Sequence, residues 1–240
     1  MLVWKSAFFI QLKWLKQYKV ASCKRAAAQK RQNGGKMNTT TNFGTRKQVQ
    51  LALFTAIILL MAFTPIGYIK TFGLEITLIV IPVVVGAIVL GPKGGAILGG
   101  IFGITSFIQC FGLSPFGAVL LGINQVGTFI VCMIPRVLMG WLTGLIFVGV
   151  RKANKNLSYA VASLAGPLLN TIFFMTTLMI FFYNTDYIQG FAKTLGTTNI
   201  IAFVFAFVGV NGLVEAIVCF VTGTVVAKAL DVIVRRSTVS

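Results

Sequence analysis

Long apolar runs that carry few charges are the feature that most constrains this chain. Six of them follow one another, and their lengths are comparable to the about 20 residues that cross a hydrocarbon core. They are Gln48–Ile66, Ile76–Leu90, Gly94–Phe111, Gly127–Val150, Ser158–Tyr183 and Ile200–Ile233. Hydrophobic residues make up 57% of the 240 residues and charged residues only 10%, too few to cover a soluble domain. The sequence therefore predicts an all-α membrane protein, a compact bundle of six transmembrane helices.

The basic residues near these segments predict the orientation of the bundle. If the chain crosses six times, only Lys70 and Lys193 fall on one side. The other side receives Arg46, Lys47, Lys93, Arg151, Lys152, Lys155, Lys228, Arg235 and Arg236. Because Lys and Arg are enriched in cytoplasmic loops, both termini are expected inside. The three outer connections, residues 67–75, 112–126 and 184–199, can then close over a pocket.

The first 36 residues differ from the rest and hold 9 of the 21 Lys and Arg residues. They are expected to be either a disordered basic extension or a segment upstream of a true start at Met37, although their composition also permits an interfacial amphipathic helix. Residues 37–47 are expected to form a cytoplasmic lead-in, and residues 48–235 the membrane domain. Since the basic residues mark helix ends, nucleic acid is not an expected partner.

Missing residue types argue against an enzyme. The chain has no His, which excludes a histidine general base and a His metal site. Its four cysteines, Cys23, Cys110, Cys132 and Cys219, form no C-x-x-C pair and are interpreted as small packing residues. No phosphate-binding loop of the type G-x-x-x-x-G-K-[ST] occurs. We therefore expect no catalytic residue, no metal and no cofactor.

Charged and amide side chains inside the spans are costly in lipid and are therefore candidate functional groups. Asn211 and Glu215 are four residues apart, so they share one face of a helix. Glu215 can accept from a ligand or form a buried structural ion pair with Arg136, and both interpretations stay open. Arg136 itself can hold a carboxylate with two parallel hydrogen bonds.

Further polar residues lie in or near the outer halves of the same segments. Asn170 and Thr171 either link two helices or contact a solute. Gln109 and Asn124 belong to the same outward-facing region. The predicted substrate site consists of Arg136, Asn170, Asn211, Glu215, Gln109 and Asn124.

Small residues at four-residue spacing predict close helix packing. The third segment carries Gly95, Gly99 and Gly103, and the fourth carries Gly140 and Gly144. We expect these glycines to close the bundle. Ala52 and Ala56 form a similar small face on the first segment.

Four ordered segments resemble the substrate-binding S components of energy-coupling factor (ECF) transporters, which take up vitamins in bacteria. They are ITLIVIPVVVGAIVLGPKGGAILGGIFGITS (76–106), IPRVLMGWLTGLI (134–146), GPLLNTIFF (166–174) and NGLVEAIV (211–218). The resemblance covers residues 48–235. The segment before Met37 has no counterpart in the family pattern.

The resemblance implies a six-helix subunit of the bacterial cell membrane that binds one vitamin near the outer face, under the loop between the first two helices. Such a subunit docks onto a transmembrane T component that carries two cytoplasmic ATPases. The family's A-x-x-x-A docking motif matches Ala52-Leu-Phe-Thr-Ala56. A flat face of small side chains permits such reversible contact.

The identity of the vitamin stays open at this point. The segments look most like the pantothenate subgroup, and one Arg with several Asn and Thr groups suits a carboxylate, hydroxyls and an amide. Riboflavin and folate are alternatives, since the aromatic residues also suit a flavin or pterin ring. Outside this family, the alternatives are an ion-coupled secondary carrier or a small channel.

Overall fold

A computed structural model describes residues 45–64, 67–70, 75–196 and 199–239. The chain divides into two units, Met1–Phe43 and Gly44–Ser240, and all described residues belong to the second. The expectations for residues 1–36, and nearly all of those for residues 37–47, lie outside the described residues.

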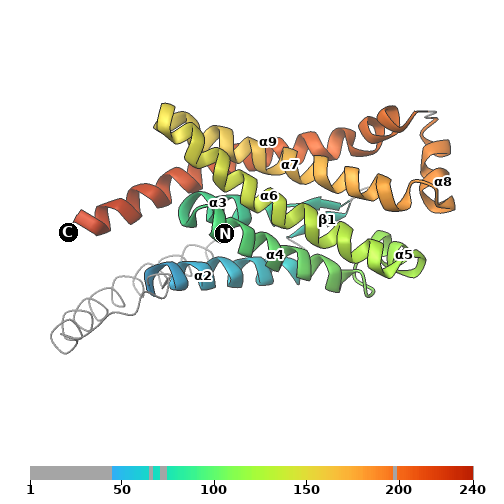
Figure 1. Cartoon of the computed structure of the whole chain (residues 1–240), viewed down its shortest axis with the longest axis horizontal. Coiled ribbons are helices and arrows are strands. Elements are labelled where there is room, and N and C mark those ends of the chain that lie inside the picture. Colours follow the sequence, from blue (N-terminus) through green and yellow to red (C-terminus); the bar gives the residue numbers. More distant parts are fainter. Residues whose placement is uncertain (1–44, 65–66, 71–74, 197–198, 240) are drawn as a thin grey trace, which may run out of the picture. The chain divides into compact units, whose positions relative to one another are not determined.

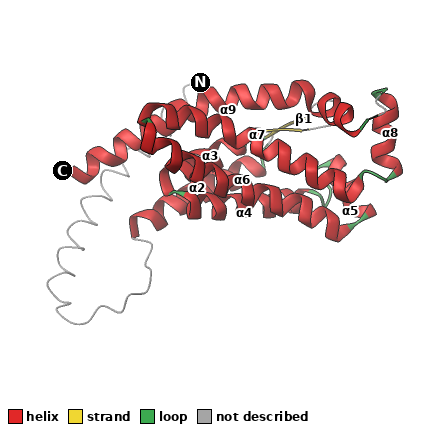
Figure 2. Cartoon of the chain, turned by 45° about the horizontal axis from the view of Figure 1, so that its top comes forward, coloured by secondary structure: helices red, strands yellow, loops and turns green. Residues whose placement is uncertain are grey.

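The described residues form eight helices and one small antiparallel hairpin. In chain order they are α2 (Thr45–Ala62), β1 (Tyr68–Lys70), β2 (Glu75–Thr77), α3 (Val80–Leu90), α4 (Pro92–Gln109), α5 (Pro115–Ile123), α6 (Gln125–Ala153), α7 (Lys155–Phe182), α8 (Asp186–Thr194) and α9 (Ile200–Val239). Figure 1 and Figure 2 show α5 and α8 at one end of the bundle and the C-terminal part of α9 at the other.

Among the residues that the structure describes, three helical stretches are long and apolar enough to cross a membrane: α6, α7 and Gly212–Ala229 of α9. The prediction of a helical membrane protein is thus confirmed, while the count of six crossings and the orientation stay predictions. With 11 residues, α3 is about 16 Å long, much shorter than a hydrocarbon core of about 30 Å. The kink at Gly209 (φ 16°, ψ −112°) breaks the regular backbone of α9.

The expected span Ile76–Leu90 is wrong at its start, because helix α3 begins only at Val80. Glu75–Thr77 is a strand that pairs with Tyr68–Lys70, so that Tyr68 faces Thr77 and Lys70 faces Glu75. Ile76 and Thr77 are β-branched and favour extended backbone, and the pairing satisfies the peptide groups that a helix would otherwise pair. The other two connections that the sequence predicts to lie outside are partly helical, since they contain α5 and α8.

The buried centre of the bundle is α3. Nine of its residues are buried, and Val80, Val83 and Val84 are fully so. A helix that is apolar all round has no face suited to water, so it is covered on every side. Its neighbours are α2, α4, α6, α7 and α9. Phe102, Met139 and Tyr159 complete this core.

Glycines bring the backbones of α4 and α6 into direct contact, as their spacing predicted. A Cβ added to Gly95 would lie 2.2 Å from the Gly140 oxygen, and one added to Gly99 would lie 2.2 Å from the Arg136 oxygen. Both distances are far below a normal contact, so only glycine fits. This contact fixes the part of α6 that carries Arg136.

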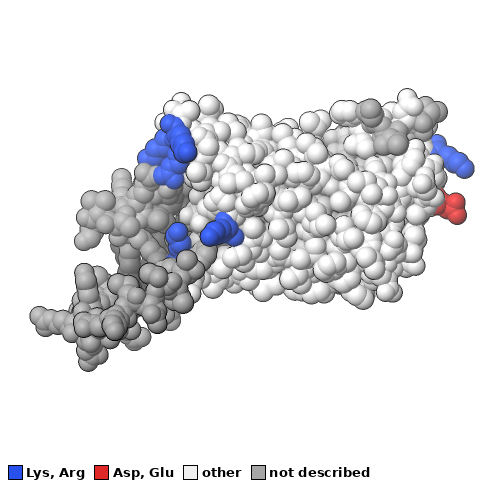
Figure 3. Space-filling view, viewed as in Figure 1, with Lys and Arg blue, Asp and Glu red and all other residues white. Residues whose placement is uncertain are grey.

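The two ends of the bundle differ in their charged side chains. Arg151 and Lys152 end α6, and Lys155 begins α7, at the end where Pro92 packs against Gly144. In Figure 3 basic side chains gather at this end, whereas α8 at the other end carries Asp186 and Lys193.

Candidate functional site

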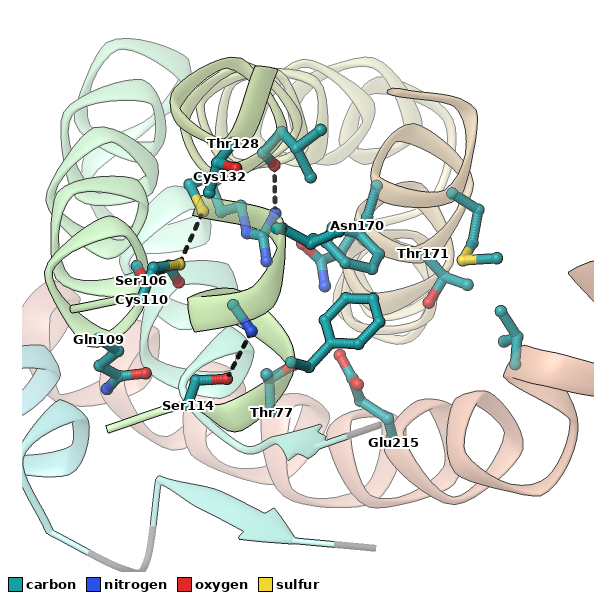
Figure 4. Close-up of a pocket in the computed structure, with 18 of the residues that line it drawn as sticks. Thr77, Ser106, Gln109, Cys110, Ser114, Thr128, Cys132, Asn170, Thr171 and Glu215 are labelled. Carbon is teal, nitrogen blue, oxygen red and sulfur yellow. Dashed lines mark hydrogen bonds between the residues drawn. The ribbon is translucent and has the colours of Figure 1, made fainter. Parts of the chain in front are cut away.

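A cavity of about 120 Å³ lies among α4, α5, α6, α7 and α9, beside the end of β2. Its wall combines apolar side chains with one guanidinium, one carboxyl group and several amide and hydroxyl groups (Figure 4). The polar residues of the wall are Thr77, Ser106, Gln109, Ser114, Thr128, Arg136, Asn170, Thr171 and Glu215. Such a mixture is typical of a small-molecule binding site.

The side chain of Arg136 is oriented by a hydrogen bond that the neighbouring Pro135 makes possible. In a regular helix the carbonyl of Val131 would accept from the N–H four residues later, but Pro135 has no N–H. The Nη1 atom of Arg136 donates to this freed carbonyl at 2.6 Å. The proline therefore creates the acceptor that orients the guanidinium.

Two aromatic rings also contact the guanidinium. Its Cζ lies 4.7 Å from the centre of the Phe174 ring and 5.5 Å from that of Phe102. These contacts stabilise a buried cation and leave its edge available for hydrogen bonds. The Nε atom of Arg136 is buried and has no hydrogen-bond partner in the described part of the chain.

Two oxygen-bearing side chains, Asn170 of α7 and Glu215 of α9, line the same cavity as Arg136. Together with Arg136 they expose only 6–7% of their surface. Asn170 Oδ1 and Glu215 Oε1 are both buried without a hydrogen-bond partner. Thr77 of β2 lines the same cavity, and β2 packs against α9, the helix that carries Glu215.

Arg136 and Glu215 do not form the ion pair that the sequence left open. Both side chains belong to the described part of the chain, and no salt bridge joins them there; each keeps an unpartnered polar atom. A buried polar atom without a hydrogen-bond partner lowers the stability of the folded protein by about 1–3 kcal/mol. Three such atoms belong to residues of one cavity wall, so the described part of the chain does not satisfy this site by its own hydrogen bonds.

The remaining predicted site residues fall in three different places. Gln109 lines the cavity, but its Nε2 donates to the carbonyl of Ala62 at 2.6 Å and so joins α4 to the end of α2. Asn124 lies outside the cavity wall: its exposed side chain accepts from the N–H of Gly127 and caps α6. The side chain of Asn211 lies outside the described residues, although its backbone belongs to α9.

Some wall residues were missed by the sequence reasoning. Thr128 and Cys132 were missed, although they lie eight and four residues before the predicted Arg136 and share its face of α6, a signal that the spacing alone contains. Thr77 had no such signal, because its place in the wall depends on the strand pairing of β1 with β2.

Comparison with known proteins identifies the family. Residues 46–227 match the family described as ECF transporter, substrate-specific component. The chain belongs to this family. Its relatives include the "Pantothenic acid transporter PanT" of Lactococcus lactis subsp. cremoris, 31% identical over 198 residues, which are 75% of this chain and 91% of the relative.

A second relative is the "Pantothenate transporter PanT" of Leuconostoc mesenteroides subsp. mesenteroides. It is 27% identical over 209 residues, which are 82% of this chain and 98% of the relative. The resemblance to ECF S components is thus confirmed, and the protein is a membrane-embedded component of a transporter.

Proposed function

We propose that this substrate-specific component binds pantothenate in the cavity beside Arg136 and delivers it to a T component driven by two ATPases. The observation that carries the proposal is the unpartnered guanidinium nitrogen of Arg136, which shares one cavity with the unpartnered oxygens of Asn170 and Glu215. The printed names of the two relatives support the choice of pantothenate over other vitamins.

The chemistry of pantothenate complements these three groups. Its carboxylate can accept from Arg136, and charge-assisted bonds of this type are the strongest in protein sites. Its hydroxyl and amide N–H groups can donate to the oxygens of Glu215 and Asn170. Binding through paired buried groups also gives discrimination, because a molecule that lacks one of them leaves a protein atom unpaired.

In our proposal the cavity opens toward the outside of a bacterial plasma membrane that the chain crosses six times. The described basic side chains at the ends of α6 and α7 support this orientation, because such residues collect on the cytoplasmic side. The cavity is bordered by α5, and α8 lies at the same end of the bundle, away from the basic side chains of α6 and α7. Binding and release require no catalytic step, so the proposed role is not enzymatic.

A titration against several vitamins tests the proposed substrate. We expect isothermal titration of the purified protein to show binding of one pantothenate per chain, and no heat of binding with riboflavin or folate. Both of these are ring systems that need a stacking surface, whereas the aromatic rings nearest Arg136 are engaged with its guanidinium. Binding of riboflavin or folate in place of pantothenate would assign the site to another vitamin.

The proposed docking face lies on α2, where Ala52 and Ala56 are exposed and one turn apart. Apolar neighbours such as Leu60, 68% exposed, extend an exposed apolar surface on the same helix. Small side chains there permit close approach of a partner helix. We infer that the T component covers this face.

Replacement of Ala52 by Trp should separate docking from binding. A bulky side chain on α2 holds the partner helix away but touches no residue of the cavity wall. We expect Ala52→Trp to keep pantothenate affinity in detergent and to abolish ATP-dependent uptake in liposomes that contain the T component and its ATPases. Ile180→Trp on α7, at a position that is 71% exposed, is the matched control and should transport normally. Normal uptake by the Ala52 variant would contradict the docking assignment.

A further inference from the structure

Two cysteines face each other in the wall of the cavity and have no role in the proposed binding chemistry. The Sγ atoms of Cys110 and Cys132 lie 3.8 Å apart. Both residues line the cavity, with 4% and 6% of their surface exposed. Figure 4 shows them together on the side of the cavity away from Asn170 and Glu215.

The packing of α4 against α6 explains why these two residues meet. A Cβ on Gly103 would lie 2.9 Å from the carbonyl oxygen of Cys132, so the backbone of α4 approaches Cys132 about two turns before Cys110. Cys110 follows the last residue of α4 and forms its C-cap. The two sulfur atoms therefore bring the C-terminal end of α4 next to the interior of α6.

A short movement brings the sulfur atoms to bonding distance. A disulfide requires about 2.05 Å between them, and Cys110 lies where the regular hydrogen bonding of α4 ends. The Cys110 Sγ also packs against Gly117 of α5, where an added Cβ would lie only 2.6 Å from it.

We infer that Cys110 and Cys132 form an oxidisable dithiol in the wall of the substrate cavity, which a peroxide converts into a disulfide between α4 and α6. One thiolate attacks a peroxide oxygen and the O–O bond breaks; the hydroxide that leaves takes up a proton as water, and a sulfenic acid results. The second sulfur attacks the sulfenic sulfur and its proton leaves with the oxygen as a second water. Two S–H bonds and one O–O bond are lost, one S–S bond forms, and the peroxide is reduced to two waters.

Substrate should protect this dithiol, and this part of the inference rests on the proposed function. A molecule bound between Arg136 and Glu215 occupies the cavity onto which both sulfur atoms open. It therefore obstructs the approach of peroxide. The formation of the disulfide itself does not depend on the identity of the substrate.

The experiment counts free thiols by mass spectrometry after maleimide labelling of denatured protein. Cys23→Ser removes the one cysteine outside the described residues and leaves three of the four. Hydrogen peroxide should reduce the thiol count of this variant from three to one, with a peptide that links Cys110 to Cys132. The double variant Cys23→Ser, Cys132→Ser has two free thiols, and peroxide should form no crosslinked peptide in it.

Cys219→Ser in the same background is the matched control, because Cys219 is buried on α9 and lies outside the cavity wall. Its count should fall from two to zero, again through the link between Cys110 and Cys132. Absence of this linked peptide under peroxide would overturn the inference. Saturating pantothenate should slow the crosslink at least tenfold; an equal rate with and without it, while the link forms, supports the dithiol and contradicts pantothenate binding in this cavity.

Discussion

The core around α3 and the cavity near α5 treat polar groups in opposite ways. No Arg, Lys, Asp or Glu belongs to the described core cluster, and α4 and α6 touch there through glycine backbone. The cavity wall instead contains a guanidinium, a carboxyl group and an amide, each with a buried atom that lacks a partner. Beside α3 the described buried atoms without a partner are neutral hydroxyls such as Thr143 Oγ1, which lies with Val84 next to Gly166. In the cavity wall they belong instead to charged and amide groups, which we propose a bound molecule pairs. The difference separates residues that pack the fold from residues that we propose bind the substrate.

The largest loss of stability should come from the glycine contact between α4 and α6. Gly99→Ala places a Cβ about 2.2 Å from the Arg136 oxygen, a clash with backbone that no rotamer change relieves. We expect a loss of roughly 3 kcal/mol or more in stability, seen as a lower thermal midpoint in detergent.

Gly100 offers a matched control one residue away on the same helix. A Cβ at Gly100 would meet only Val137 Cγ2 at 3.7 Å, an ordinary contact. Alanine is also the better helix former by about 1 kcal/mol, so Gly100→Ala should keep or raise the midpoint. Equal midpoints for the two variants would show that α4 and α6 are not in backbone contact.

The smallest effect should come from Asn124, which the sequence places in the substrate site and the structure places at a helix N-terminus. Asn124→Ala removes the cap of α6 and should reduce stability by about 1 kcal/mol, while pantothenate affinity changes by less than about twofold. Asn124→Ser keeps a capping oxygen and should restore the stability. A tenfold loss of affinity in both variants would return Asn124 to the binding site.

Much of the helical architecture was predictable from the sequence because apolar runs report directly on burial in lipid. The spans that became α6 and α7 were placed within a few residues of their observed ends. The glycine contacts of α4 with α6 were also predictable, because four-residue spacing defines one helix face. Local patterns of this kind carry their information within a single element.

The hairpin and the short helices could not be predicted in the same way. Strand β2 exists because Glu75–Thr77 pairs with Tyr68–Lys70, a contact between two segments that no single apolar run encodes. The same reason hid Thr77 from the predicted site. Arg136 and Glu215 could be nominated separately by their cost in lipid, but only the fold could show that the two groups remain unpaired.

The central claim is that Arg136 binds the carboxylate of pantothenate. The most direct test is isothermal titration of the wild type and Arg136→Ala with pantothenate and with its alcohol, in which a hydroxyl group replaces the carboxylate. We predict that the wild type prefers pantothenate about 100-fold, or ~3 kcal/mol, and that Arg136→Ala loses this preference while it remains folded. Equal affinity of the wild type for both molecules, or an unchanged preference in the folded Arg136 variant, would contradict the account.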